Sequence, residues 1–387
     1  MVRTLVTGSA TTTFATHTDR SLGDLAGDAA AAAIASAALV AADVDAVVFG
    51  NAAEGVLRGQ EMIRAQVALK GSGLEGAAMI NTENACASGS AALHLGRALL
   101  LAGQADTVLV VGAEKLVHPD KQRSFDAIES GADRSLTLDT GVRGSVMMAA
   151  YAAEARAYAA EHGPVDEALA RIAVKNREFA ARTDFAQFRS PIDTATVRAS
   201  RMVADPLRLL MCSPLTDGAA AVVLQSDSTA GERGRTAVEV LGTRVGSVRR
   251  GDSVVRATTR ALYRDTQVDP ADVDVLQLHD ASAIAELVQY EHVGLAPAGG
   301  GRALALDGRT ALGGDRPVNT DGGLMSRGHA LGATGVAQVV ELVRQLSGTA
   351  GPRQVPGARL GLASNSGGWM GEDYAACVAT LLAAPAA

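Results

Sequence analysis

A cysteine in a run of small residues is the first side chain of this sequence that could act as a nucleophile. Cys86 lies in NTENACASGSAAL, where Gly89 and its small neighbours permit a tight turn from a strand into a helix. At the start of a helix, the dipole and the free N–H groups are expected to stabilise a thiolate, the reactive form of cysteine. An acyl group carried on such a thiol divides a transfer reaction into two easier steps. The motif alone leaves open the other role of Cys86, that of a buried structural cysteine.

A histidine in a glycine-rich stretch could supply the base that this thiol needs. His329 lies in GGLMSRGHALGATG, whose five glycines indicate a loop where the backbone approaches a ligand closely. His329 could take the thiol proton or donate a hydrogen bond to an oxyanion. A loop that cradles a phosphate, or a histidine that only caps the following helix, would give the same pattern.

Three more residues could provide hydrogen-bond donors. His279 ends the apolar run VLQLH, and α/β sheets bind their ligands at the carboxyl ends of strands. It could hold a water or donate to a carbonyl oxygen, although a structural histidine fits the pattern equally well. Gly367 and Gly368 in SNSGGWMG could offer a backbone N–H to a second oxyanion, and a plain turn is the alternative there.

The cysteine usage predicts a reducing, cytoplasmic setting. The chain has three cysteines with wide spacing and no CxxC pair, so neither a metal site nor a disulfide framework is expected. Cys212, in LMCSPLTDG, is interpreted as a packed thiol, and Cys377, in AACVATLL, as a core residue.

The composition argues against nucleic-acid and membrane partners. The 387 residues carry a net charge of −7 and no basic block, which is a poor basis for binding nucleic acid. The first residues lack the basic-then-apolar pattern of a signal peptide, and the apolar stretch Ala29 to Ala42 is too short to span a bilayer.

Runs of β-branched residues alternate with helical stretches rich in alanine and leucine. This alternation predicts an α/β fold, with a mainly parallel sheet covered by helices on both faces. The segment from about Glu114 to Asp205 breaks the rhythm and is interpreted as an inserted, mainly helical subdomain. The expected strands are 2–8, 45–49, 107–111 and 219–224, and the expected helices are 24–39 and 86–101.

An internal repeat indicates that one α/β unit occurs twice. ADVD stands at 42–45 and again at 271–274, and an apolar strand follows each copy. Later in each copy comes a reactive residue, Cys86 or His329, then a glycine three positions on, an apolar helix and another strand. If the two units pack with pseudo-twofold symmetry, the two helix starts meet and Cys86 faces His329. Strand–helix echoes also occur in α/β proteins that are not duplicated.

Four motifs in order carry a resemblance to the thiolases. ENACASGSAAL, SPLTDGAAA, GHALGATG and SGGWMG resemble thiolase motifs, in particular those of the sterol-carrier-protein-type branch, where HD replaces the NE of other thiolases. The resemblance covers nearly the whole chain. It implies a five-layered αβαβα fold of duplicated units, with an N-terminal half (1–240) that contains a loop domain at about 115–205 and a C-terminal half (241–387).

The same resemblance implies roles for the candidate residues. Cys86 would be acylated by an acyl-CoA and His329 would be its activating base. His279 would match the residue that orients a water in one oxyanion hole, and Gly367 would match the backbone donor of the other, together with the N–H of Cys86. It further implies a dimer, a loop domain that binds coenzyme A, and a CoA thioester as substrate without a permanently bound cofactor.

Two departures from the thiolase pattern concern the second half of the reaction. Thiolases use a second cysteine as acid and base, usually in a CxG motif, but Asn365 occupies that position here. Members of the sterol-carrier branch often supply it in HDCF, where this chain has HDASA with Ala281 and Ser282. Ala330 also replaces the usual proline of GHP. The acylation half is therefore expected to be intact, while the carbon–carbon half lacks its usual proton-transfer group.

These observations predict an acyl-CoA C-acyltransferase that passes an acyl group from Cys86 to a small-molecule carbon acceptor. One alternative is a specialised acyltransferase of secondary metabolism that acylates a non-CoA molecule with a partner subunit. Another is a non-catalytic subunit that works with an OB-fold or second thiolase-like partner. An aldolase-like activity is disfavoured because aldolase-like relatives tend to lack the nucleophilic cysteine.

Overall fold

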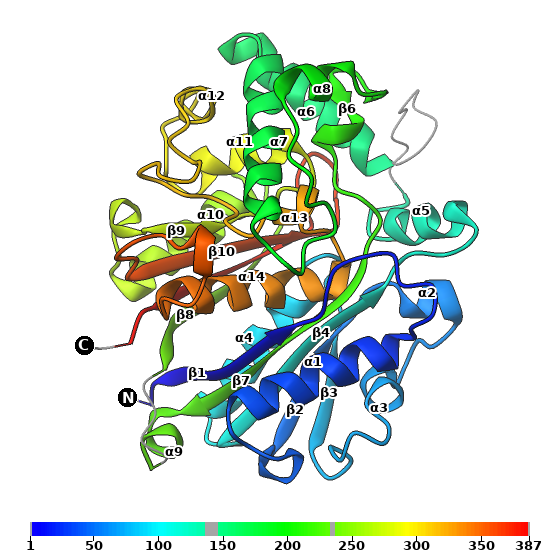
Figure 1. Cartoon of the computed structure of the whole chain (residues 1–387), viewed down its shortest axis with the longest axis vertical. Coiled ribbons are helices and arrows are strands. Elements are labelled where there is room, and N and C mark those ends of the chain that lie inside the picture. Colours follow the sequence, from blue (N-terminus) through cyan, green and yellow to red (C-terminus); the bar gives the residue numbers. More distant parts are fainter. Residues whose placement is uncertain (1, 136–145, 233–236, 386–387) are drawn as a thin grey trace.

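The molecule is built on a single continuous sheet with helices on both of its faces (Figure 1). The computed structural model describes residues 2–135, 146–232 and 237–385. Within them, the sheet has nine strands in the order β3-β2-β4-β7-β1-β8-β11-β10-β9. The strands are β1 (Thr4–Thr11), β2 (Ala46–Gly50), β3 (Ala78–Thr82), β4 (Thr107–Lys115), β7 (Asp217–Ser226), β8 (Val238–Ser247), β9 (Val275–Gln277), β10 (Leu360–Gly367) and β11 (Ala376–Ala383).

The helices fall into two halves and an insert. Those of the N-terminal half are α1 (Leu22–Ser36), α2 (Glu54–Arg58), α3 (Arg64–Ala68), α4 (Ser88–Leu101) and α9 (Asp227–Glu232). The insert has α5 (Lys121–Glu129), α6 (Val146–His162), α7 (Asp166–Ala181), α8 (Thr194–Ala199) and a hairpin of β5 (Met202–Ala204) and β6 (Leu207–Arg208). The C-terminal half has α10 (Val254–Thr266), α11 (Ala283–His292), α12 (Gly301–Leu306), α13 (Gly323–Ser326) and α14 (Leu331–Leu346). None of the helices in the described ranges is long and apolar enough to cross a membrane.

Two helices lie between the two halves of the sheet. Within the described residues, β1 and β8 pair at two positions, Leu5 with Glu239 and Val6 with Val238. Helices α4 and α14 contact strands of both halves, while α1 covers the outer face of the first half and α10 that of the second (Figure 1). Nearly every residue of α14 is buried, as expected for a helix with apolar neighbours on all sides. The resulting order, helix–sheet–helix–sheet–helix, is the predicted five-layered αβαβα arrangement.

The pairing of the strands is the same in both halves. Counted outward from the β1–β8 junction, β7 pairs with β1 and β4 with β7 in antiparallel fashion, and β2 and β3 follow in parallel. In the second half, β11 and β10 pair antiparallel and β9 follows in parallel. The parallel bridge of Leu276 to Val318 stands where β3 stands in the first half. Equal strand order and equal directions support the duplication inferred from the repeat.

The repeated ADVD motif makes the same hydrogen bonds twice. The carboxylate of Asp45 accepts from the N–H groups of Asp106 and Thr107, both at 2.9 Å, where β4 begins. The carboxylate of Asp274 accepts from Arg359 and Leu360, at 2.7 and 2.9 Å, where β10 begins. Each aspartate thus fixes the start of the neighbouring strand.

The prediction of a mainly parallel sheet is wrong, because five of the eight strand pairings are antiparallel. The insert after β4 brings the chain back in the opposite direction as β7. Antiparallel strands usually show alternating polarity because one face is wet, but every residue of β7 is buried. A strand covered on both faces reads as a continuous apolar run whichever way it points, so this sequence did not reveal its direction.

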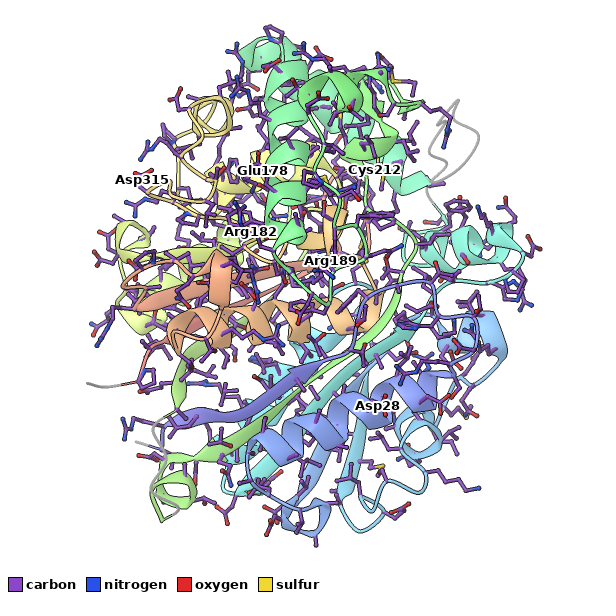
Figure 2. The ribbon with its side chains drawn as sticks, viewed as in Figure 1. Asp28, Glu178, Arg182, Arg189, Cys212 and Asp315 are labelled. Carbon is purple, nitrogen blue, oxygen red and sulfur yellow. The ribbon has the colours of Figure 1, made fainter. Side chains whose placement is uncertain are left out.

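The insert packs mainly on the C-terminal half. Residues of α6 and α7 share one hydrophobic core with α10, α11 and β9. Just beyond β6, Cys212 forms a backbone bridge with Ser282 and lies where the insert meets the C-terminal half (Figure 2).

Candidate active site

Cys86 stands in a tight turn just before α4. Ala85 has a φ of +47°, a left-handed conformation that costs a non-glycine residue roughly 1–2 kcal/mol. The Ser88 hydroxyl holds this turn, since it donates to the carbonyl of Ala85 at 2.6 Å and accepts from the N–H of Asn84 at 2.9 Å. The strain is thus balanced by local hydrogen bonds, and the turn places Cys86 in the lining of a cavity.

His329 stands in the corresponding place before α14, and its protonation pattern follows from its neighbours. Its Nδ1 lies 2.8 Å from the hydroxyl of Thr334. That hydroxyl has one proton, which it donates to the carbonyl of Ala330 at 3.0 Å. Nδ1 of His329 must therefore be the donor, and Nε2 carries the lone pair that a base requires.

Two glycines bring these helix starts together. A Cβ on Gly89 would lie 2.4 Å from the carbonyl oxygen of Gly332, and one on Gly332 would lie 2.7 Å from that of Gly50. The glycine three positions after each reactive residue therefore lets α4 and α14 touch backbone to backbone. As a result, Cys86 and His329 face each other across the boundary between the halves.

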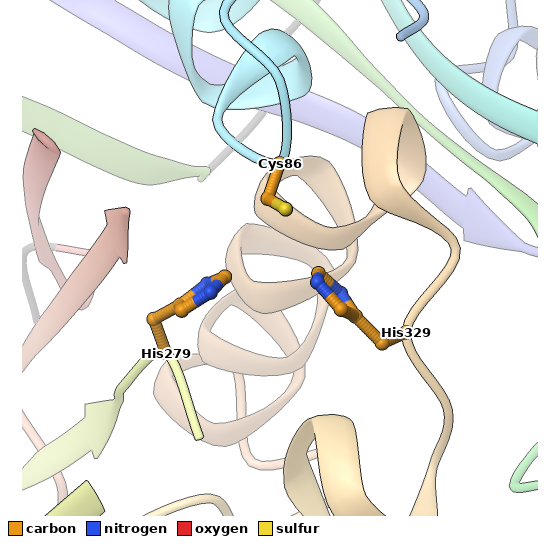
Figure 3. Close-up of side chains that lie close together, drawn as sticks. All are labelled: Cys86, His279 and His329. Atoms are coloured by element: carbon orange, nitrogen blue, oxygen red, sulfur yellow. The ribbon is translucent and has the colours of Figure 1, made fainter. Parts of the chain in front are cut away.

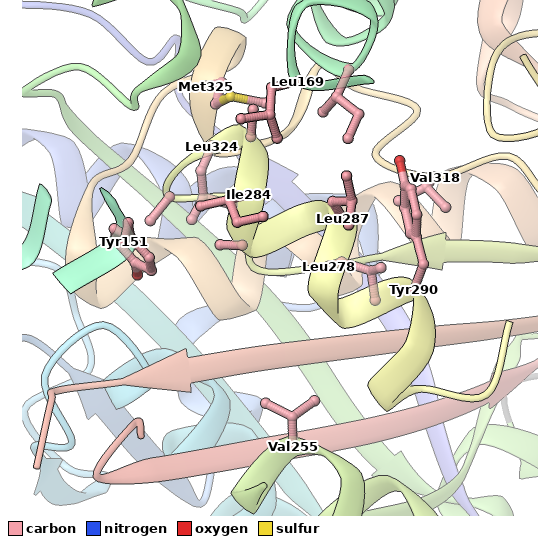
Figure 4. Close-up of a cluster of buried hydrophobic side chains, with 14 of the residues drawn as sticks. Tyr151, Leu169, Val255, Leu278, Ile284, Leu287, Tyr290, Val318, Leu324 and Met325 are labelled. Atoms are coloured by element: carbon pink, nitrogen blue, oxygen red, sulfur yellow. The ribbon is translucent and has the colours of Figure 1, made fainter. Parts of the chain in front are cut away.

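His279 completes a three-residue cluster. The Cys86 sulfur and one ring nitrogen of each of the two histidines all lie within 4.8 Å of one another. Figure 3 shows both rings pointing toward the thiol, and their planes meet at 82° with centroids 5.2 Å apart. Leu278, the residue before His279, is anchored with Ile284 in the core beneath the insert, which fixes where the histidine emerges (Figure 4).

Burial sets the resting charge of the cluster. It raises the pKa of the Cys86 thiol to about 12, against the opposing effect of a hydrogen bond from the backbone N–H of Gly368. It also lowers the pKa of His279 to about 3 and holds the pKa of His329 well below its usual range. Burial therefore opposes the stabilised thiolate that the sequence led us to expect, and α4 begins only at Ser88, two residues after the thiol. At rest the cluster is a neutral thiol beside two neutral imidazoles.

The cavity above the cluster has a volume of about 750 Å³. Beside Cys86 its wall is apolar, with Leu116, Ala127 and Ile128 packed near the sulfur. Further out, the insert contributes Phe125, Met147, Met148, Tyr151, Val203 and Leu209. Arg201 is the one arginine or lysine among the described residues that line it. Glu83 is the one carboxylate among the same residues, so the otherwise mostly apolar lining has one cationic and one anionic side chain.

Gly367 and Gly368 lie against the Cys86 turn. A Cβ on Gly367 would be 2.1 Å from the carbonyl oxygen of Asn84, and Gly368 has a φ of +66°. Only glycines permit this approach, and it aims the N–H of Gly368 at the Cys86 sulfur. Of the two, Gly368 is the donor that the structure places at the thiol.

Cys212 packs against the core shared by the insert and the C-terminal half, as interpreted from the sequence, and it also lines the same cavity. It is half-buried, and its sulfur donates to the carbonyl of Arg208 at 3.4 Å. The sequence could not show this, because the cavity wall is formed by segments far apart in the chain. Cys377, by contrast, is fully buried as expected.

The sequence reasoning missed Glu114, which fixes the start of α14. Its buried carboxylate accepts from the N–H groups of Ala52, Ala53 and Gly332 at 3.0–3.1 Å. Burial raises the pKa of this carboxyl to about 7. A charged residue at the end of the apolar run VLVVGAE was the available signal, since such a strand buries a carboxylate only when hydrogen bonds satisfy it.

Cys86, His279 and His329 are also types of residue that bind a metal, but their protonation states do not fit one. A metal needs a lone pair on each histidine nitrogen that faces it. Nδ1 of His279 accepts a hydrogen bond from the amide nitrogen of Asn365 at 3.1 Å, so its proton is on Nε2. The cluster as built is suited to proton transfer rather than to metal binding.

Comparison with known proteins identifies the family. The model of the thiolase N-terminal domain matches residues 4–228, and a thiolase C-terminal domain-like model matches residues 249–380. The chain belongs to the thiolase family. Among its relatives is an acetyl-CoA acetyltransferase of Methanothermobacter thermautotrophicus, 38% identical over 94% of this chain and 96% of the relative.

Other relatives confirm the sterol-carrier resemblance and the fold. Sterol carrier protein 2 of Oryctolagus cuniculus is 33% identical over 94% of this chain and 70% of the relative. The benzoylsuccinyl-CoA thiolase subunit BbsB of Thauera aromatica is 34% identical over 84% of each chain. A chain of the Ltp2–ChsH2(DUF35) aldolase has the same fold, with a TM-score of 0.82, 23% identity and coverage of 99% of this chain and 98% of that one.

The structure shows what stands at the two positions where thiolases often carry a second cysteine. Ala281 lines the cavity and offers only a methyl group. Asn365 is fully buried behind His279 and binds its ring. Besides Cys86, the only thiol among the described residues that line the cavity is therefore Cys212.

Proposed function

We propose that this thiolase-family chain is an acyl-CoA C-acyltransferase that carries the acyl group as a thioester on Cys86. The convergence of Cys86, His329 and His279 at the floor of the 750 Å³ cavity supports this proposal most directly. Nε2 of His329 takes the thiol proton as sulfur attacks the thioester carbonyl, and His279 donates to the developing oxyanion. Collapse of the tetrahedral intermediate expels the CoA thiolate, which recovers the proton from His329. The enzyme is left acylated, and the acyl group then passes to a carbon acceptor.

Intact-protein mass spectrometry after incubation with a panel of acyl-CoA thioesters tests this proposal. The mass of one acyl group should appear on the wild type and on Cys212→Ala, but not on Cys86→Ala. The Cys212 variant is the matched control because it removes the other thiol of the same cavity. Failure of every acyl-CoA to acylate Cys86 would contradict the function.

A second candidate is an acyltransferase whose acceptor needs no strong base. It is favoured by Ala281 and Asn365, which leave no thiol at the two expected positions. An assay of acetoacetyl-CoA cleavage by free CoA separates the candidates, because an ordinary thiolase cleaves it and a specialised acyltransferase does not. The purely non-catalytic subunit is less favoured, since it would not need Cys86 beside a histidine in the base-competent form.

The same proposal includes the oligomeric state of the chain and its partners. We expect a homodimer with CoA thioester and small-molecule substrates, in the cytoplasmic setting inferred from the cysteines. A further subunit is suggested by two relatives, the benzoylsuccinyl-CoA thiolase subunit and the Ltp2–ChsH2(DUF35) assembly. Light scattering gives the mass of the purified chain alone, which tests the homodimer, and its mass after co-purification from its source, which tests for a further subunit.

A further inference from the structure

Behind the two histidines lies a set of buried polar side chains that the proposed reaction does not itself use. Asn365, at the end of β10, is fully buried, and its amide nitrogen lies 3.1 Å from Nδ1 of His279. Its amide oxygen accepts from the hydroxyl of Ser90 at 2.9 Å. Ser90 belongs to the first turn of α4, so the chain of hydrogen bonds runs from the Cys86 helix through β10 to His279.

The fold leaves room for this chain of hydrogen bonds. A Cβ on Gly335 of α14 would lie 1.8 Å from the Ser90 hydroxyl and 2.7 Å from the Asn365 amide oxygen. These side chains are buried, since Ser90 is only 4% exposed and His279 only 1%. The backbone of His279 is held separately by Gln289, whose amide donates to its carbonyl at 2.8 Å and accepts from its N–H at 3.3 Å. What Asn365 controls is therefore the ring and its protonation, rather than the path of the chain.

An amide nitrogen can only donate, so Nδ1 of His279 must be an acceptor and Nε2 must carry the proton. His329 has the opposite arrangement, because Thr334 leaves its Nε2 with a lone pair. We propose that Asn365 is a positioning residue that fixes His279 as the hydrogen-bond donor of the site, while Thr334 fixes His329 as its base. This inference deepens the proposed acyl transfer and rests on it for its catalytic consequence.

The assignment of one donor and one acceptor solves a problem that two adjacent imidazoles create. With lone pairs on both Nε2 atoms, neither ring could stabilise an oxyanion. With protons on both, neither could deprotonate Cys86. The low pKa values of both rings, caused by burial, prevent a doubly protonated ring from filling either role. A neighbour that only donates at Nδ1 of His279 thus keeps this ring in the form that can donate from Nε2.

The decisive measurement is ¹⁵N NMR of the imidazole rings, which reads each tautomer directly and does not depend on activity. In the wild type at neutral pH, His279 should carry its proton on Nε2 and His329 on Nδ1. Asn365→Asp offers only acceptor atoms, so the His279 proton should move to Nδ1. Acylation of Cys86 by an acyl-CoA should then slow on the order of 10²–10³-fold, as for loss of one oxyanion donor.

Two further variants keep the proposal falsifiable if Asn365→Asp does not fold. Ser90→Ala removes the bond that orients the amide, and should give a mixture of His279 tautomers with a smaller loss of rate. Ser366→Ala changes the next residue of β10, which points to the opposite face of the sheet, and should leave tautomers and rate unchanged. A wild-type His279 with its proton on Nδ1, or unchanged tautomers in both Asn365→Asp and Ser90→Ala, would overturn the inference. Absence of acylation in the wild type would instead contradict the proposed function, while the NMR result would still decide the role of Asn365.

Discussion

The two halves of the molecule share their strand pairing and differ in the residues at matching positions within or just after their strands. Five residues after Asp45 comes Gly50, and five residues after Asp274 comes His279. In the same way, Gly112 of β4 corresponds to Asn365 of β10. One half therefore has glycine at the end of β2 and within β4, where the other has a histidine just after β9 and, within β10, the asparagine that binds it.

The contacts explain this difference. A Cβ added to Gly50 would lie 2.7 Å from the Cα of Gly89. A Cβ added to Gly112 would lie 2.4 Å from the carbonyl oxygen of Gly332. In the first half, the starts of α4 and α14 therefore pack directly against the strand backbone. In the second half, His279 and Asn365 fill the equivalent space with a hydrogen-bonded pair. The shared frame brings two helix starts together, and the different residues at these matching positions turn their meeting point into a site with a donor and a base.

The largest expected effect comes from replacing His329, which stands before α14 where Cys86 stands before α4. His329→Ala should lower the rate of Cys86 acylation by about 10³-fold, because the neutral thiol then has no base. The rate is measured by mass spectrometry over time with a fixed acyl-CoA. His162→Ala, in the insert and outside the cavity, should behave as wild type. A loss of less than about tenfold in His329→Ala would mean that another group takes the proton.

Adding a side chain at Gly112, the position in β4 that matches Asn365 in β10, should destabilise the fold. Gly112→Ala places a methyl 2.4 Å from the Gly332 carbonyl, between two backbones that cannot move apart freely. We expect a loss of about 3 kcal/mol in the free energy of unfolding, measured by denaturant titration. Gly27→Ala is the matched control, since no atom of the described part of the chain lies within 4 Å of an added Cβ, and this change inside α1 should stabilise by about 0.5–1 kcal/mol. Equal signs for the two variants would refute the close approach of β4 and α14.

The symmetric aspartates should have symmetric effects. Asp45→Ala and Asp274→Ala each remove the acceptor for two N–H groups at a strand start, so each should cost about 1–2 kcal/mol of unfolding free energy. Thermal and denaturant unfolding of both variants measures these two losses of unfolding free energy. Asp106→Ala, a neighbouring exposed aspartate, should change stability by less than about 0.5 kcal/mol. A clear effect in only one of the two halves would show that the repeated motif has lost its role in the other.

The smallest expected effect concerns the resting thiol. Because burial raises the pKa of Cys86 to about 12, the thiolate is scarcely populated at pH 7, and its fraction should rise steadily with pH instead of levelling off near the ordinary thiol value of about 8.5. Alkylation of Cys86 by iodoacetamide, followed from pH 6 to 9.5 with peptide mass spectrometry, should show no plateau. The Cys212→Ala variant simplifies the measurement. A plateau below pH 8 would indicate a preformed thiolate.

Much of the frame could be inferred from the sequence because its signals are local. ADVD, the glycine three positions after Cys86 and after His329, and the apolar runs that follow are each contained within a few residues. These patterns specify turns, helices and strands, and their repetition specifies two similar units. The family followed from the same short motifs.

The tertiary structure alone decided how those residues act. Asn365 and His279 are 86 positions apart, and no local pattern joins an amide to that particular ring. The direction of β7, the cavity position of Cys212 and the role of Glu114 likewise depend on segments that meet only on folding. The charge state was also hidden, because desolvation in the folded molecule opposes the thiolate that a helix start was expected to favour. The sequence by itself thus determined which residues are present and in what frame, while burial and long-range hydrogen bonds determined which of them donates, which accepts and which stays neutral.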